Sequence, residues 1–448
     1  MKNVLILGAG QSTPYMINYM LENAEKHDWF VTVCDMDISL AKSRVNGNTR
    51  GTAIEFDVND EVLRKRLISE SDIVLNLLAP QFQYMIALDC LHFGKHVVTA
   101  SYTNLRVADL NNDAMRKGMI ILNEMGLDPG IDHMSAMAMI HKIRENGGYV
   151  AGFVSYGGGL PAPDVKSNPL DYCITWNPRN VIMAGRDGAQ YMEDSQVKIL
   201  SHQECFQRTW NVEIDGVGTF EAYPNRDSLI YLDVFNLKKA HTMLRGTLRY
   251  PGWSETWEKI IKLGLPNDTM VLKGIADKSY AEFIEMFLPL NMTGSTLEAR
   301  VARYLNISPT GKIMDNLKWL GLFSTEKIGK EFRTTVDVMT DLVKKKMPLP
   351  EGKRDMVILR HEIEAVYPNE NNRKEKIIST MIDYGVPNGF TAIAKTVGAP
   401  AAIAAKLILN DELPIKGTHI PIQPVIYKKV MAELETLGIK FEKEVIPM

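Results

Sequence analysis

Two glycines near the start of the chain have the residue type and spacing that bind a dinucleotide. Gly8 and Gly10 follow an apolar run, 4–7, which predicts a strand covered on both faces. Their turn would let the backbone approach a pyrophosphate, and a helix beginning at Pro14 would direct its amides at that anion. The usual third glycine is missing, because Thr13 stands near its place. A tight turn with no ligand is the alternative interpretation.

An aspartate strengthens the dinucleotide hypothesis. Asp35 ends the apolar run 29–34 and lies 25 residues after Gly10. A carboxylate near this spacing grips a ribose 2′-hydroxyl and repels a 2′-phosphate, which favours NAD over NADP. Ser39 or Arg44 could still contact a phosphate, so the expected cofactor is NAD or NADP with a lean to NAD. A solvated turn carboxylate is the alternative for Asp35.

The bulk composition is that of an ordinary globular protein and excludes several classes. The 448 residues are enough for two or three domains. The net charge of −3 without a basic run argues against a nucleic-acid partner, and no apolar run approaches the length of a membrane span. Four scattered cysteines and nine histidines show no metal-binding spacing, so no metal is expected. Reduced thiols and an N-terminus that enters a strand at once predict a cytoplasmic protein.

Strands and helices alternate through about residue 125, which predicts a doubly wound parallel sheet of the Rossmann type. The predicted strands are 4–7, 29–34, 52–57, 72–78, 95–101 and 119–123.

Beyond Gly147-Gly148 the pattern changes to a second, mixed or antiparallel sheet. Half-exposed strands are predicted over 149–156 and 212–215, with the glycines of 157–159 lying between them. Apolar positions at three and four spacing predict helices through 254–346. A strand over 355–361 and a long Ala-rich helix over 390–409 follow.

Two polar loops follow predicted strands of the first sheet. They are 100–102 (Ala-Ser-Tyr) and 124–133, a Gly- and Pro-rich turn containing Asp128. At strand ends such loops place polar groups over the nicotinamide region. The alternative for Asp128 is the N-cap of a helix over 131–143, which an Asp-Pro start would also explain.

An ordered set of strings resembles the saccharopine dehydrogenase family, specifically its glutamate-forming saccharopine reductases. Each string is modest alone, but the set covers nearly the whole chain in the right order. The strings are 126–133, 155–164, 176–181, 223–228, 244–252, 354–361 and 391–398.

The resemblance implies three domains and a homodimer. A Rossmann domain would comprise 1–128 and 390–448, and a mixed α/β domain binding substrate and supporting dimers would comprise 129–252 and 352–389. A helical domain, 253–351, would be inserted in the latter. The implied partner is a small amino-acid substrate.

The implied reaction joins glutamate to 2-aminoadipate 6-semialdehyde as an imine, which NAD(P)H reduces to saccharopine. Proton transfer would fall to Tyr102 and Asp128. Saccharopine carries three carboxylates, which guanidinium forks bind well. The substrate positions implied by the resemblance are Ser101, Tyr102, Asp128, Arg226, Arg245, Gly246 and Thr247.

The resemblance also implies a set of cofactor contacts. They are Gly8, Gly10, Gln11, Ser12, Asp35, Asp57, Val58, Asn76, Leu77, Leu127, Asp128 and Ile131. One departure is Gly157, where some relatives carry a cysteine. Two other functions fit less of the sequence: an imine reductase of the carboxynorspermidine dehydrogenase type, and a non-catalytic protein that senses a dinucleotide.

Overall fold

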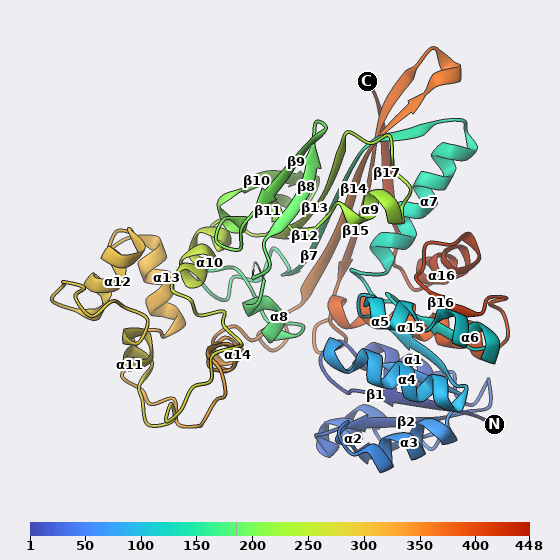
Figure 1. The fold of residues 1–448 in the computed structure, drawn as a ribbon, viewed down its shortest axis with the longest axis horizontal. Helices are drawn as coiled ribbons and strands as arrows, with labels where there is room; N and C mark the ends of the chain where they lie inside the picture. Colours follow the sequence, from blue (N-terminus) through green and yellow to red (C-terminus); the bar gives the residue numbers. More distant parts are fainter. Residues whose placement is uncertain (185) are drawn as a thin grey trace. The chain divides into compact units, whose positions relative to one another are not determined.

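The computed structural model describes residues 1–184 and 186–448, which form two compact units (Figure 1). The first unit comprises 1–149, 365–375 and 379–448, and the second comprises 150–364 and 376–378. The helical stretch 253–351 lies within the second unit. The division into three domains therefore stays a prediction.

A seven-stranded parallel sheet forms the centre of the first unit and confirms the predicted fold class. Its strand order is β16-β6-β5-β4-β1-β2-β3. Each apolar run makes one strand, because a strand with helices on both faces has no solvated side. The strands are β1 (Lys2–Leu7), β2 (Trp29–Asp35), β3 (Gly51–Glu55), β4 (Ile73–Asn76), β5 (His96–Thr99), β6 (Ile120–Leu122) and β16 (Gly417–His419).

The helices of the first unit connect these strands or extend from the sheet. They are α1 (Pro14–Glu22), α2 (Ile38–Val45), α3 (Glu61–Glu70), α4 (Gln83–Phe93), α5 (Leu105–Ala108), α6 (Asn111–Lys117), α7 (Ile131–Glu145), α15 (Ala392–Leu409) and α16 (Pro424–Thr436), with 3-10 turns η1 (Pro80–Phe82) and η3 (Pro368–Glu370). The strand order changes direction between β1 and β4. Ligands of such sheets bind at this point, outside the carboxyl ends of the strands.

Helix α15 is long and apolar. It has 18 residues with a mean hydropathy of 1.5, so by length and composition it could span a membrane. However, 83% of it is buried within the protein, as in a core helix. Its Gly398 lies so close to α1 that an added Cβ would be 2.9 Å from Met16 N. Small residues in α15 thus allow close packing against α1.

A ten-stranded mixed sheet contains the strands of the second unit, together with strands 373–384 and 442–447, whose residues lie mostly or wholly within the ranges of the first unit. Its main path runs β10-β11-β13-β7-β14-β15-β17, with β8, β9 and β12 off this path. The strands are β7 (Tyr149–Pro161), β8 (Ala189–Glu193), β9 (Gln196–Leu200), β10 (Trp210–Ile214), β11 (Gly218–Pro224), β12 (Arg226–Asp227), β13 (Thr242–Arg249), β14 (Asp355–Tyr367), β15 (Arg373–Tyr384) and β17 (Glu442–Pro447).

Strand β7 differs from its prediction. It does not end at Tyr156 but continues through the glycines of 157–159 to Pro161, and it is mostly buried. Gly158 shows why glycine is used in this strand. A Cβ there would lie 3.0 Å from the Cβ of Leu248 on the neighbouring β13. The glycine run is therefore a site of close strand packing rather than a turn.

The predicted helical stretch is confirmed as a set of short helices. They are α10 (Trp253–Lys262), α11 (Tyr280–Glu285), α12 (Leu297–Leu305), α13 (Lys312–Leu320) and α14 (Thr335–Lys346), while α8 (Pro178–Ile182), α9 (Ile230–Val234) and η2 (Cys205–Gln207) precede them.

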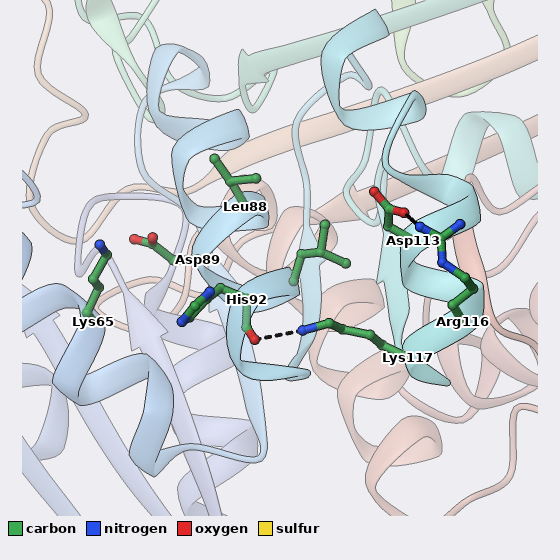
Figure 2. A pocket seen from close by; sticks show the side chains of 8 residues that line it. Lys65, Leu88, Asp89, His92, Asp113, Arg116 and Lys117 are labelled. Carbon is green, nitrogen blue, oxygen red and sulfur yellow. Dashed lines mark hydrogen bonds and ion pairs between the residues drawn. The ribbon is translucent and has the colours of Figure 1, made fainter.

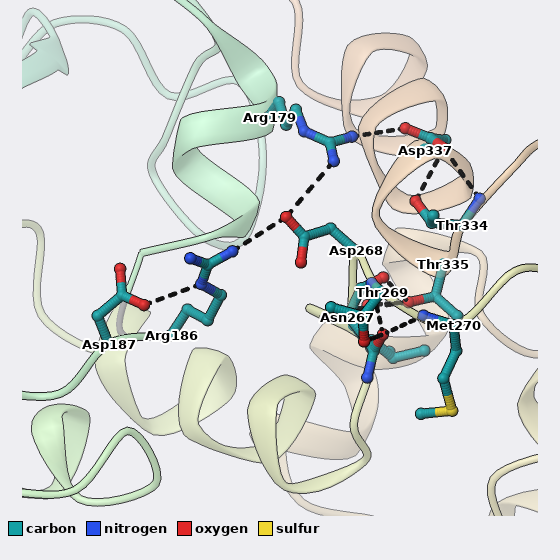
Figure 3. A network of polar contacts seen from close by, with 11 residues as sticks. Arg179, Arg186, Asp187, Asn267, Asp268, Thr269, Met270, Thr334, Thr335 and Asp337 are labelled. Atoms are coloured by element: carbon teal, nitrogen blue, oxygen red, sulfur yellow. Dashed lines mark hydrogen bonds and ion pairs between the residues drawn. The ribbon is translucent and has the colours of Figure 1, made fainter. Parts of the chain in front are cut away.

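An ion-pair network ties this stretch to the region around α8 (Figure 3). Arg179 Nη1 lies 2.5 Å from Asp337 Oδ1 on α14, and Arg186 Nη1 lies 3.0 Å from Asp268 Oδ2. Partly exposed pairs contribute little individually. Together they link segments far apart in the sequence within the second unit.

Candidate active site

The glycine turn after β1 is open on the side where a pyrophosphate would bind. Gly8 has a φ of +103°, and a Cβ there would be 3.2 Å from Leu77 O. A Cβ on Gly10 would meet no heavy atom within 4 Å. The turn therefore fits a pyrophosphate, and Gln11 and Ser12 follow within it before α1 begins.

Thr13 explains how the turn works without a third glycine. Its Oγ1 donates a hydrogen bond to Gly10 O at 2.8 Å, and its backbone N donates to the same oxygen at 3.1 Å. The side chain is only 3% exposed. Because the hydroxyl folds back onto the turn, a threonine takes the glycine position with its polar group satisfied.

The carboxylate of Asp35 lies against the same turn. Its Oδ2 accepts a hydrogen bond from Ala9 N at 2.7 Å, and its Oδ1 accepts one from Asp37 N at 2.9 Å. Arg44 Nε donates to Ala9 O at 3.3 Å. Asp35 and Arg44 thus both form hydrogen bonds with the backbone of Ala9, the residue between the two glycines.

Four other predicted cofactor residues lie at or just after the ends of β3 and β4. Asn76 ends β4 and is 2% exposed, with Oδ1 accepting from Leu78 N at 3.2 Å. Leu77 N donates to Leu7 O at 2.9 Å, which holds it beside the glycine turn. Asp57 and Val58 follow β3. These residues all lie in the first unit, at the edge where dinucleotides bind.

The two predicted proton-transfer residues are in direct contact. Tyr102, after β5, donates its hydroxyl to Asp128 Oδ1, after β6, at 2.5 Å. The backbones of their loops are also joined, because Glu124 N donates to Ser101 O at 3.2 Å. The structure thus brings together Ser101, Tyr102 and Asp128 at the ends of adjacent strands.

The alternative interpretation of Asp128 as an N-cap is wrong. The N-cap of α7 is Gly130, with no side-chain cap. Asp132 in the first turn accepts hydrogen bonds from Gly130 N at 2.7 Å and His133 N at 2.8 Å. Because Asp132 satisfies these amides from within the helix, the Asp128 carboxylate is left to face Tyr102.

Gly130 closes the loop that carries Asp128. Its φ is +148°, and an added Cβ would lie 2.0 Å from Gly126 O. Gly126 N donates to Pro129 O at 2.9 Å, and Ile131 N donates to Gly126 O at 2.8 Å. Leu127 and Asp128 lie at the tip of this tight turn.

Gly130→Ala is expected to destabilise the protein by about 2–4 kcal/mol, because it combines backbone strain with a backbone clash. Gly216→Ala is the matched control: Gly216 also has a positive φ, +73°, but open space around it. Its cost should be about 1 kcal/mol. Urea unfolding of both variants measures the difference, and equal costs would contradict the packing assigned to this loop.

A buried polar cluster, for which the sequence pattern predicts no role, supports the same two loops. His133 is fully buried, with Nδ1 2.6 Å from Asp132 Oδ1 and Nε2 3.6 Å from Glu124 Oε2. Glu124 Oε1 also accepts from Thr103 N at 3.0 Å. The cluster connects α7 to the segment after Tyr102, so it positions the Tyr102–Asp128 pair.

The predicted substrate arginines belong to the second unit. Arg245 on β13 is 5% exposed, and its Nη1 donates to Tyr231 OH at 3.0 Å. Its guanidinium lies 4.6 Å from the Tyr231 ring centroid, a cation–π distance. Arg226 is exposed, with a φ of 51°, and Asn225 N donates to Arg245 O at 2.8 Å. The two arginine-bearing segments are therefore adjacent.

Gly246 and Thr247 continue the β13 row. A Cβ on Gly246 would lie 3.0 Å from Tyr156 Cδ1, so this position is too tight for a larger residue. Thr247 pairs with Gly157 on β7 and with Tyr223 on β11. Gly157, where some relatives carry a cysteine, is thus the cross-strand neighbour of a predicted substrate residue.

None of the four cysteines of this chain is suited to act as a reactive thiol in place of the cysteine that some relatives carry at the position of Gly157. All four are buried. Burial raises the pKa of Cys34 to about 12 and of Cys205 to about 11, and it also raises the pKa of Cys90 and Cys173. A thiol with a raised pKa is a poor nucleophile at neutral pH.

A separate pocket of about 490 Å³ lies on the first unit, lined by α3, α4 and α6 (Figure 2). Lys65, His92 and Lys117 are among its lining residues. None of the predicted site residues lines it.

The family models match most of the chain in two segments. Residues 4–122 match the saccharopine dehydrogenase NADP binding domain, and residues 126–439 match the saccharopine dehydrogenase C-terminal domain. The chain belongs to the saccharopine dehydrogenase family. This membership confirms the resemblance seen in the sequence, and with it a nicotinamide dinucleotide as the cofactor.

Fungal relatives in this family match over nearly their full length. Saccharopine dehydrogenase (NADP(+), L-glutamate-forming) of Schizosaccharomyces pombe is 31% identical over 100% of this chain and 99% of the relative. The enzyme of the same name from Pyricularia oryzae is 32% identical, over 99% of each. The solved apo structure of saccharopine dehydrogenase (L-Glu forming) from Saccharomyces cerevisiae is 30% identical, covers 100% of both chains and has a TM-score of 0.86.

Proposed function

We propose that this saccharopine dehydrogenase family member is the glutamate-forming enzyme, an oxidoreductase that interconverts saccharopine with glutamate and 2-aminoadipate 6-semialdehyde. Full-length similarity to enzymes with this name carries the assignment. The contact between Tyr102 and Asp128 supplies a proton-transfer pair at the edge of the sheet where the nicotinamide would lie.

The chemistry requires little beyond positioning, charge and proton transfer. The dinucleotide would be held at the turn of Gly8 and Gly10 and would supply the hydride acceptor in the oxidative direction. The carbon oxidised would be the one on the lysine side of the secondary amine nitrogen. The resulting imine adds water, and the carbinolamine then breaks its C–N bond to release glutamate and the aldehyde. Asp128 would stabilise the cationic imine and, with Tyr102, move the protons of water addition and C–N cleavage.

Purified protein should reduce NAD or NADP when saccharopine is added and should not do so with carboxynorspermidine. The carboxynorspermidine alternative calls for acidic groups where this chain has Arg226 and Arg245. A purely sensing protein would bind the dinucleotide without oxidising saccharopine. Absence of turnover with either cofactor would contradict the proposed reaction.

The preference between NAD and NADP is a separate proposal. The family model and the fungal relatives are named for NADP, whereas Asp35 contacts the glycine turn here. A carboxylate at the end of β2 repels a 2′-phosphate, so we propose that this chain uses NAD more efficiently.

Asp35→Ser is expected to raise the ratio of kcat/KM for NADP to that for NAD at least about tenfold, because a like-charge repulsion is removed. Asp37→Ser is the matched control, since Asp37 Oδ1 caps α2 by accepting from Ser39 N and Leu40 N. Serine can also cap a helix, so this variant should keep the wild-type ratio. An unchanged ratio in Asp35→Ser would overturn the proposed preference.

We further propose that the enzyme is a homodimer in the cytoplasm, as the resemblance and the reduced cysteines lead us to expect. Light scattering on the eluting protein would give the mass of two chains. A monomer that retains full activity would contradict the dimer.

A further inference from the structure

Arg249 has a buried guanidinium whose charge is not balanced by any ion pair in the described part of the chain. It ends β13 and is 4% exposed. In the described part of the chain no carboxylate forms an ion pair with it, and its Nε has no hydrogen-bond partner. Its Nη1 donates only to Leu248 O, at 2.8 Å. Burying a charge without a partner is costly.

Aromatic rings surround this guanidinium. Its central carbon lies 4.8 Å from the ring centroid of Tyr172, 5.6 Å from that of Trp253 and 5.9 Å from that of Tyr223. Such rings attract a cation and hold it in place, but they provide no counter-charge. Burial raises the pKa of Tyr172, so its hydroxyl stays neutral.

The acid across the strand pair is engaged elsewhere. Glu221 on β11 is the cross-strand partner of Arg249. Its Oε1 accepts a hydrogen bond from Ser254 N, at 3.1 Å, in the first turn of α10. Although the two residues are paired across the strands, no ion pair joins Glu221 to Arg249.

Arg249 also lies in line with predicted substrate residues. Side chains two residues apart share a face of a strand, so Arg245, Thr247 and Arg249 form one row on β13. Arg245 and Arg249 are about 13 Å apart along the strand, so they would bind different carboxylates.

We propose that Arg249 binds one carboxylate of the amino-acid substrate and is the third guanidinium of the binding site. This inference rests on the proposed function, because saccharopine has three carboxylates and the resemblance supplies only Arg226 and Arg245. The planar guanidinium of Arg249, held by aromatic rings, is suited to bidentate binding of a carboxylate, and that carboxylate would be its missing counter-charge.

The test compares Arg249→Met and Arg249→Lys in the full-length protein. Both variants should weaken saccharopine binding at least 30-fold, measured as KM and by calorimetry on protein saturated with dinucleotide. Lysine keeps the charge but lacks the fork. The Kd for the dinucleotide should stay within twofold, and the melting temperature of Arg249→Met should not fall, since an unpaired buried charge is removed.

Arg208→Met and Arg208→Lys are the matched controls, because Arg208 is exposed and its Nη1 donates to Tyr191 OH at 2.9 Å. Their saccharopine KM should equal that of wild type. If wild type binds saccharopine and Arg249→Lys binds it within twofold of wild type, Arg249 is structural and the inference is overturned while the proposed function stands. If wild type neither binds nor oxidises saccharopine, both are overturned.

Discussion

Asp128→Asn is expected to lower kcat/KM for saccharopine by about 10²–10⁴-fold, the range for losing a general acid or base. The amide keeps the shape of the side chain but cannot take up a proton or stabilise a cationic imine. Tyr102→Phe should also lower kcat, because it removes the hydroxyl that donates to Asp128. Steady-state kinetics in both directions measures these effects.

Asp109→Asn is the control for this variant, since Asp109 is exposed in the same unit. It should behave as wild type. The loops around Asp128 are held by backbone bonds and by the Glu124–His133–Asp132 cluster. The free energy of unfolding of Asp128→Asn should therefore change by less than about 1 kcal/mol. Full activity in Asp128→Asn would remove it from the proposed mechanism.

Arg245→Met is expected to raise the KM for saccharopine by about 10²-fold or more. Truncating one partner of a buried, hydrogen-bonded charge pair costs roughly 2–5 kcal/mol, and each 1.4 kcal/mol is tenfold. Arg245 is 5% exposed, and Tyr231 orients its guanidinium. In the variant, water would therefore have little access to replace the hydrogen bonds that the guanidinium gives to the substrate carboxylate. The effect should fall on KM more than on kcat, because the carboxylate is bound throughout the reaction.

Arg208→Met serves as the control for Arg245→Met as well. Both arginines donate to a tyrosine hydroxyl in the second unit, but only Arg245 is buried on β13. A saccharopine KM unchanged in Arg245→Met would show that the buried arginine does not bind substrate.

The parallel sheet could be predicted because its central strands are short, mostly apolar runs. Residues 29–34 became β2 with one residue added, Asp35. The last strand, β16, has only three residues, Gly417–His419, and no pattern of its own, so the sequence gives no local signal for it. Its pairing with β6 depends on tertiary structure.

The glycines of 157–159 show a limit of turn signals. Glycine is typical of turns, but it also occurs where strands approach closely, and only the neighbour Leu248 distinguishes the two cases. The burial of Arg249 is hidden in the sequence for a related reason. A lone arginine is usually solvated, and the rings that bury it, Tyr172, Tyr223 and Trp253, are distant in sequence. The period of two from Arg245 was the available signal.

Identifying the product of saccharopine oxidation most directly tests whether this protein is the glutamate-forming enzyme. The secondary amine of saccharopine has a carbon on each side of nitrogen, and the carbon that loses hydride determines the products. We predict glutamate and 2-aminoadipate 6-semialdehyde, with one glutamate formed for each reduced nicotinamide. Formation of lysine and 2-oxoglutarate in place of glutamate would contradict the account.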